Sequence, residues 1–358
     1  MELPLIAMTM GDPAGVGPEV IAGVWPDLRL HAYCRPFVVG HPEIMRRAAR
    51  VRGVEVDVVE IKQPENARPS PTALPCLTIG NDELLEIPPC TVDARAGHAA
   101  YEALVVAAKL ALARRIDAIT TAPLHNVALH LAWHDYPGHT ELLAELCGVR
   151  DFAMMLYLGP DERVRGPAGL AVVHVTLHMA LAQVFEALSP EAIVVKSRLA
   201  DQVMRRIKGA GPRMGICALN PHAWEGGLFG REEIEIIQPA IQQALAEGLN
   251  VEGPLPADTL MVRAAAGEFD AVVAMYHDQG HIALKLLGMH RAVNVTLGLP
   301  IVRTSVAHGT AFDLAWRGVA ETSSMLEAVR VASVLSNKAR REDASVTDTP
   351  AARQTIAD

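Results

Sequence analysis

Residues 3–18 read LPLIAMTMGDPAGVGP, and this stretch decides the fold class of the chain. The apolar run 3–10 is short and continuous, which is typical of a strand buried on both faces. Residues 11–18 are rich in glycine and proline and indicate a tight loop, and a helix is expected from about Glu19. A buried strand, a loop and a helix in this order form the repeating unit of a parallel α/β sheet.

The same unit recurs along the chain. A strand over 37–40 precedes a helix over 42–51, and a helix over 97–115 leads into a strand over 118–123. Further strands are expected over 169–178, 213–219 and 271–276. This alternation predicts an α/β fold with mainly parallel sheets and helices on both faces.

Composition excludes several classes of protein. Aromatic residues make up 4% of the 358 residues, so Leu, Val, Ile, Ala and Met must fill the core. The net charge of −9 argues against a nucleic-acid or anionic-membrane partner. No run is long and apolar enough to span a bilayer and no basic leader is present, so we expect a cytoplasmic protein. The five cysteines are widely spaced and odd in number, which argues against a disulfide framework.

Three histidines closely follow expected strands, namely His178, His222 and His277. Ligands of open α/β sheets bind outside the carboxyl ends of the strands, so these side chains should meet in one cleft. Neutral imidazoles are common ligands of divalent metals, and three of them suit a metal with open coordination positions. The alternative is that each is an ordinary structural histidine.

The segment 276–285 combines a histidine, a carboxylate and an amine within a short distance. A lysine beside other charges or in a buried position can act as a base, so we assign this role to Lys285, with Asp278 orienting it. A solvated loop with a capping aspartate is the alternative reading of the same residues.

Three segments have the composition of anion-binding loops. His139 and Thr140 stand at an expected helix start, where backbone N–H groups and a hydroxyl can bind an anion or simply cap the helix. Residues 11–17 resemble a phosphate loop but match neither standard glycine-rich motif. Residues 308–315 fit either a mononucleotide-recognition loop or a helix cap.

Taken together, these strings resemble the 4-hydroxythreonine-4-phosphate dehydrogenase family. The matching strings are MGDPAGVGPE over 10–19, GHTE over 138–141, NPHA over 220–223, YHDQG over 276–280, GLP over 298–300 and HGTA over 308–311. They occur in order over nearly the whole chain. Residues 226–230 and 280–285 look more like the branch of the family that acts on four-carbon sugar-acid phosphates, threonate or erythronate 4-phosphate.

The resemblance implies a role for individual positions. His178, His222 and His277 match three divalent-metal ligands drawn from both subunits of a homodimer, with 178 and 222 from one chain and 277 from the other. The metal can be zinc, cobalt, manganese, nickel or magnesium. Substrate contacts match His139, Thr140, Asp258, Asp278, Lys285, Asn294 and Arg303. Residues of the loop that binds the nucleotide, NAD or NADP, match His308, Gly309, Thr310, Ala311 and Asp313.

The resemblance also implies the two-domain architecture of the isopropylmalate and isocitrate dehydrogenases. We expect a first domain over 1–135 plus 305–340 that contributes the nucleotide loop. A second domain over 136–304 carries the metal ligands and the dimer interface, and residues 341–358 form a flexible tail.

The expected function is therefore metal-dependent, NAD-linked oxidation of a 4-phosphorylated four-carbon hydroxy acid, followed by decarboxylation. Two alternatives stay open: a cis-dihydrodiol dehydrogenase of an aromatic dicarboxylate, and a metabolite-binding protein without catalysis. The second rests on departures from the family, which commonly has a lysine at the position of Asn126. Relatives also often have glycine at the positions of Trp133, Trp224 and Trp316.

Overall fold

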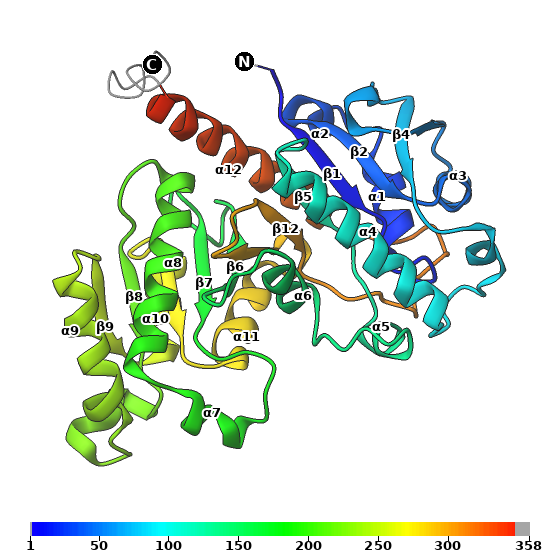
Figure 1. Ribbon diagram of the computed structural model, residues 1–358. Coiled ribbons are helices and arrows are strands. Elements are labelled where there is room, and N and C mark those ends of the chain that lie inside the picture. The colour runs from blue at the N-terminus through cyan, green and yellow to red at the C-terminus, as the bar shows by residue number, and fades with distance from the viewer. Residues whose placement is uncertain (1, 348–358) are drawn as a thin grey trace, which may run out of the picture.

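One sheet of twelve strands extends through both halves of the protein (Figure 1). The computed structural model describes residues 2–347, and of residues 224, 226 and 338–347 it describes the backbone alone. The strand order is β3-β4-β2-β1-β5-β12-β11-β6-β7-β10-β8-β9. The strands are β1 (Leu5–Thr9), β2 (Arg35–Gly40), β3 (Asp57–Ile61), β4 (Ala73–Thr78), β5 (Ala118–Thr121), β6 (Ala153–Leu158), β7 (Leu170–His174), β8 (Met214–Cys217), β9 (Val251–Leu255), β10 (Ala271–Ala274), β11 (Val293–Leu297) and β12 (Arg303–Val306).

Helices connect most of these strands and cover both faces of the sheet. They are α1 (Gly17–Val24), α2 (Leu28–Tyr33), α3 (Pro42–Arg52), α4 (Ala94–Leu112), α5 (Asn126–Leu131), α6 (His139–Leu146), α7 (Leu181–Ala187), α8 (Pro190–Lys208), α9 (Gln238–Ala246), α10 (Ala257–Ala265), α11 (His277–Gly288) and α12 (Ser323–Thr347). Strand pairs are parallel except where β11 meets β12 and β6, and where β6 meets β7. The predicted α/β class with mainly parallel pairing is thus confirmed.

The opening stretch of the sequence folds as its pattern predicts. All five residues of β1 are buried, and the strand lies in the middle of its half of the sheet, between β2 and β5. Helix α1 begins at Gly17, whose position leaves no room for a side chain, because a Cβ there would lie 2.4 Å from the carbonyl oxygen of Met10. The tight loop therefore returns the chain directly onto the sheet.

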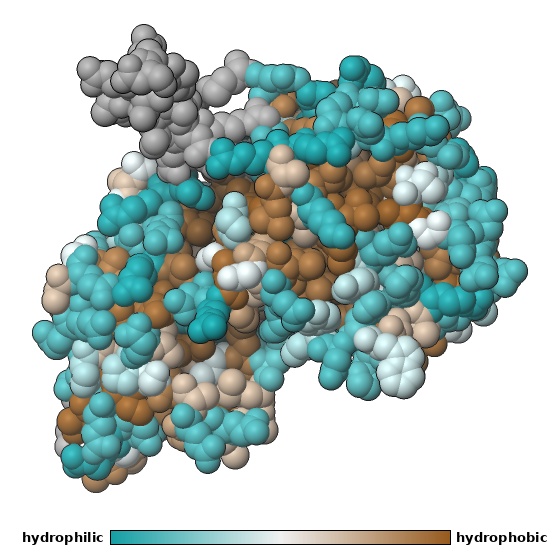
Figure 2. Space-filling model, viewed as in Figure 1, coloured by the Kyte–Doolittle hydropathy of each residue, from teal (hydrophilic) through white to brown (hydrophobic). Residues whose placement is uncertain are grey.

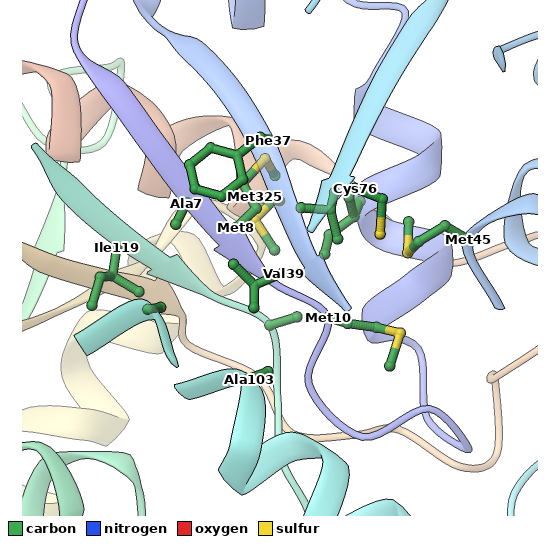
Figure 3. Close-up of a cluster of buried hydrophobic side chains, with 14 of the residues drawn as sticks. Ala7, Met8, Met10, Phe37, Val39, Met45, Cys76, Ala103, Ile119 and Met325 are labelled. Atoms are coloured by element: carbon green, nitrogen blue, oxygen red, sulfur yellow. The ribbon is translucent and has the colours of Figure 1, made fainter. Parts of the chain in front are cut away.

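Methionine takes much of the space that aromatic residues fill in other cores. Figure 3 shows Met8 and Met325 beside the ring of Phe37, with Met10 and Met45 elsewhere in the same cluster of buried side chains. These side chains belong to the strands and helices of the first half, and each is fully buried. The unbranched, flexible methionine side chain suits the irregular gaps between a sheet and its helices.

Alternate residues of the central strands point to opposite faces of the sheet and enter different cores. Met155 and Tyr157 of β6 pack in the core that includes α8, α9 and α12, whereas Leu156 and Leu158 pack in the core beneath α10 and α11. This follows from the two-residue period of a strand. Both faces of the second half are therefore covered.

The two halves of the sheet are joined by the antiparallel pair β11 and β12, in which Val293 lies opposite Val306. Helix α12 (red in Figure 1) packs against β5 and β12 of the first half and against β11 and α8 of the second. The division into domains at residues 135 and 305 remains a prediction.

The structure differs from the sequence-based expectation in two places. Strand β7 ends at His174, four residues before the predicted end, so His178 lies in the following loop. Helix α12 continues to Thr347, so residues 341–347 of the expected tail are helical, and the rest of that tail, 348–358, lies outside the described residues. Among the described helices, none has a stretch that is both long and apolar enough to cross a membrane.

Candidate functional site

A cavity of about 260 Å³ lies where the two halves of the sheet meet. Figure 2 shows a largely hydrophilic surface with hydrophobic colour gathered between the two halves. Nine of the predicted site residues line this cavity: His139, Thr140, His178, His277, Lys285, Asn294, Arg303, His308 and Gly309. Segments far apart in the sequence thus converge on one site.

Arg303 forms the floor of the cavity from strand β12. Its side chain is 1% exposed, and its two terminal nitrogens donate hydrogen bonds to the hydroxyls of Thr296 at 2.9 Å and Thr121 at 2.7 Å. The Nε atom is buried without a partner. Burial lowers the pKa of the guanidinium to about 9. A buried cation with a free donor at a cavity is a natural partner for an anion.

His139 and Thr140 approach the same cavity from the start of helix α6, as the sequence predicts. The helix begins at His139 after Gly138, so its first backbone N–H groups have no partner within the helix. Burial and the neighbouring Arg303 hold the pKa of His139 well below its usual value. The imidazole is therefore neutral at physiological pH, so of these two side chains Arg303 alone carries a positive charge.

Two other lining residues carry buried polar atoms without a protein partner. They are Asn294 Oδ1, on strand β11, and Glu141 Oε2, on helix α6. A buried polar atom without a hydrogen bond lowers stability by about 1–3 kcal/mol, so such atoms are uncommon unless a ligand satisfies them. Both are acceptors and suit hydroxyl or amine hydrogens of a bound molecule.

Two of the three predicted metal ligands meet in the cavity. The rings of His178 and His277 have centroids 5.8 Å apart, and Glu141 holds the pKa of His178 above its usual value, through a contact of 3.9 Å. His222 lies apart, in the one-turn helix Pro221–Gly227, where its Nδ1 is 2.9 Å from Glu225 and its ring meets Phe229 edge-on.

The residues present therefore fit a metal only in part. Within residues 2–347, no group of three or more His, Cys, Asp or Glu side chains is arranged to hold a metal ion. The structure pairs residue 178 with residue 277 in one chain, whereas a site built from 178 and 222 of one chain and 277 of another was expected. One chain brings His178 and His277 to the cavity, and His222 is not among the lining residues.

Residues 277–288 form helix α11, so the alternative interpretation of residues 276–285 as a solvated loop is wrong. His277, His281 and Lys285 are spaced four residues apart, which places them on one face of the helix, and all three line the cavity. The rings of His277 and His281 stack 3.7 Å apart. His281 was missed from the sequence, although the four-residue spacing could have revealed it.

A second missed residue is His174, which is fully buried in strand β7. Its Nε2 lies 3.0 Å from Nδ1 of His281, and burial lowers the pKa of His174 to about 3 and that of His281 to about 2. Both imidazoles are thus neutral. The position of His174 inside an apolar strand gave no signal in the sequence beyond its proximity to His178.

The predicted nucleotide loop packs against the glycine-rich loop that follows β1. The backbone N–H of Val16 donates to the carbonyl of Thr310 at 3.0 Å, and Phe312 stacks on His125 at 5.0 Å. Of this loop, His308 and Gly309 reach the cavity, and a side chain at Gly309 would meet no atom within 4 Å. Ala311 has a left-handed backbone with φ 43°, and Asp313 is exposed.

Two predicted substrate contacts lie outside the cavity lining. Asp258 is exposed in the first turn of α10 and accepts a hydrogen bond from the backbone of Thr259. Asp278 contacts Nδ1 of His277 at 2.6 Å, so the structure shows it orienting that histidine and gives it no contact with Lys285. Its neighbours beside His277 include Leu177 and Met179.

The residues that depart from the family pattern lie in different parts of the structure. Asn126 lines the cavity at the start of α5. Trp133 is 94% exposed, whereas Trp316 donates a hydrogen bond to Pro13 and lies under Arg47. Both tryptophans have left-handed backbones, at φ 63° and 61°, a conformation that favours glycine. The side chain of Trp224 lies outside the described part of the structure.

Comparison with known proteins gives consistent results over nearly the full chain. The profile of the family described as pyridoxal phosphate biosynthetic protein PdxA matches residues 32–332. The D-threonate 4-phosphate dehydrogenase of Cupriavidus necator is 44% identical, over 94% of this chain and 98% of its own.

Two solved structures extend the comparison to three dimensions. A 4-hydroxythreonine-4-phosphate dehydrogenase from Burkholderia phymatum is 44% identical, covers 94% of this chain and 99% of its own, and superposes with a TM-score of 0.77. A terephthalate 1,2-cis-dihydrodiol dehydrogenase from Burkholderia xenovorans LB400 is 30% identical, over 93% of this chain and 98% of its own, with a TM-score of 0.61.

Proposed function

This chain belongs to the family of the pyridoxal phosphate biosynthetic protein PdxA, and from this premise we propose that it oxidises a 4-phosphorylated four-carbon hydroxy acid with NAD. It is a dehydrogenase that acts on a CH–OH group. A binding protein without catalysis is therefore no longer an alternative. The observation that carries the choice of substrate is the charge of the cavity.

The cavity is lined by more basic than acidic side chains. Arg303 and Lys285 are the basic ones, and Glu141 is the single carboxylate among the described lining residues. That carboxylate already faces His178 at 3.9 Å. A substrate with a phosphate and a carboxylate complements these two basic side chains, whereas an additional ammonium group would have to share Glu141 with His178. We therefore favour threonate or erythronate 4-phosphate over 4-hydroxythreonine 4-phosphate.

The proposed reaction divides the work among the lining residues. Arg303 and the start of α6, with His139 and Thr140, hold the phosphate. Lys285, in its neutral form, takes the proton of the hydroxyl on C3 as the C3–H bond breaks. When bound, NAD accepts the hydride from C3; NADP is the alternative acceptor. The resulting ketone is β to the carboxylate, so the bond between C2 and the carboxylate carbon can break to release carbon dioxide. The electron pair of that bond forms the enolate of the ketone, and C2 then takes up the proton that Lys285 accepted.

A substrate comparison tests this proposal. With added divalent metal, we expect NADH formation at 340 nm with threonate or erythronate 4-phosphate at a kcat/KM at least about tenfold above that with 4-hydroxythreonine 4-phosphate, because one unpaired charge costs more than about 1.4 kcal/mol. Chelation should abolish the reaction. A cis-dihydrodiol of terephthalate serves as the control substrate, and a higher kcat/KM for it would overturn the proposal.

We further propose that two copies of the chain complete each site. Beside His178 and His277 lies an apolar hollow of about 350 Å³, lined in part by Leu181 and Val184. Leu181 is 62% exposed, and Leu228, in the segment that follows His222, is 70% exposed. Exposed apolar groups next to an incomplete ligand set suit an interface with a second copy. His222 of that copy would join His178 and His277 around a divalent metal, which would polarise the substrate hydroxyl.

Mixed dimers test the shared site. His178→Ala and His222→Ala should each be inactive as pure proteins, because each removes one ligand from every site. In a dimer with one chain of each kind, one site loses both ligands and the other keeps all three, so co-expression should restore activity to about a quarter of the wild-type level. Co-expression of His178→Ala with His277→Ala, whose ligands lie in the same chain, is the matched control and should restore none. If the first mixture also stays inactive, the shared site is wrong.

A further inference from the structure

Helix α11 packs against strand β7 below the cavity so closely that no side chain fits between them at Gly280. At Gly280 a Cβ atom would lie 2.5 Å from Cγ1 of Val172 and 2.6 Å from Nε2 of His174. Even alanine would therefore force the helix away from the strand. The absence of a side chain at this position brings His281, the next residue, into direct contact with His174.

The contacts of His174 fix which nitrogen of each ring carries the hydrogen. His174 Nδ1 lies 3.4 Å from the carbonyl oxygen of Met154, which can only accept, so this nitrogen is the donor. In a neutral ring the other nitrogen, Nε2, is then an acceptor, and it lies 3.0 Å from Nδ1 of His281. His281 must therefore donate from Nδ1. Its Nε2 is then an acceptor.

His281 is also held in orientation. Its ring lies flat on that of His277, with centroids 3.7 Å apart and planes inclined by 13°. The ring lines the cavity between His277 and Lys285, so it lies between the candidate metal ligand and the candidate base. With Nδ1 occupied by His174, the polar atom that the ring can offer to a bound molecule is Nε2.

From these contacts we infer that His281 is a specificity-determining residue, whose Nε2 accepts a hydrogen bond from the substrate hydroxyl that is not oxidised. His174 and the carbonyl of Met154 act as positioning groups, because they set the tautomer of His281. The inference rests on the proposed function, in which the hydroxyl on C3 reacts and that on C2 does not. An acceptor fixed in this position favours a substrate with a donor at C2, because a substrate without that donor leaves the acceptor without its hydrogen bond.

The test combines a variant with a substrate analogue. The wild-type protein should prefer threonate 4-phosphate over its 2-deoxy analogue by about tenfold to a hundredfold in kcat/KM. In His281→Phe, which keeps the flat ring against His277 but has no acceptor, this preference should shrink to about twofold or less. His281→Gln, whose amide oxygen can accept, should recover part of the preference. A purely structural role for His281 would lower activity with both substrates equally.

His130→Phe is the matched control, because His130 is an exposed histidine on α5 that contacts Asp135, outside the cavity lining. It should keep the wild-type preference, and thermal unfolding should show all variants folded. An unchanged preference in His281→Phe, or no preference in the wild type, overturns the inference. If neither compound is oxidised, the proposed function fails; the ratio of their dissociation constants, measured by calorimetry in wild type and His281→Phe, then decides on His281 separately.

Discussion

Replacement of Arg303 by methionine is expected to lower kcat/KM by about a thousandfold and to leave the free energy of unfolding nearly unchanged. The loss of activity follows from the removal of the buried cation that faces the phosphate, an interaction worth about 3–5 kcal/mol when both charges are desolvated. The small effect on folding follows from two opposing contributions. Thr121 and Thr296 lose a hydrogen-bond donor, at a cost of about 1–2 kcal/mol. A buried charge that is expensive to desolvate disappears at the same time.

Steady-state kinetics and urea unfolding of the Arg303→Met protein check both parts. Arg330→Met is the matched control, because Arg330 is also partly buried but pairs with Glu327 on α12, outside the cavity lining. This control should keep its activity and lose stability. A kcat/KM for Arg303→Met within threefold of the wild type would show that Arg303 does not bind substrate.

The pH dependence of stability should also reveal the cost of burying the charged Arg303 side chain. The pKa of Arg303 in the folded protein, about 9, lies below that of a free guanidinium, because burial disfavours the charged form. Folding is therefore penalised below pH 9, and the penalty declines as the pH rises from 9 towards the unfolded pKa. Relative to Arg303→Met, the wild-type protein should gain stability over this range.

Substitution of Lys285 by alanine is expected to lower kcat by about a hundredfold to ten-thousandfold, the usual contribution of a general base. Lys285 lies two turns along α11 from His277 and lines the cavity, which is the position required of a group that takes the proton from a substrate hydroxyl. KM should change much less, because the phosphate contacts remain.

Two further variants separate a base from a fixed charge. Lys285→Arg keeps the positive charge, but a guanidinium is protonated at neutral pH and cannot accept the proton, so this variant should be as slow as Lys285→Ala. Lys208→Ala is the control, because Lys208 pairs with Asp270 away from the cavity, and it should turn over normally. Normal turnover of Lys285→Ala at neutral pH would contradict the assignment of Lys285 as the general base.

The sequence carried enough information for the fold but only for part of the site. The apolar run that becomes β1 and the glycine-rich loop after it are local patterns, so they were predictable. His178 and His277 were found because each follows a strand. His281 was missed although it lies four residues after His277. Its contact with His174 depends on how closely α11 approaches β7, a tertiary distance that no spacing in the sequence encodes.

Other errors have equally physical causes. Residues 276–285 could be read as a loop because Asp278 and Gly280 interrupt the apolar pattern, yet the glycine is there to let the helix approach the strand. Asp258 and Asn294 came from the family resemblance alone, and the structure brings Asn294 to the cavity but not Asp258. The proposed contribution of His222 from a second copy depends on how two chains assemble, which local patterns in a sequence do not encode.

The antiparallel pairing of β11 with β12 limits how far the two halves of the enzyme can move apart. Backbone hydrogen bonds cross the boundary between the halves at this strand pair, and helix α12 packs against both halves. A rigid opening of the two halves would break the backbone hydrogen bonds between β11 and β12. Entry and exit of ligands must instead flex the sheet or shift the loops at its rim, so the slowest motions of the protein should be found in those loops and not in a swinging domain.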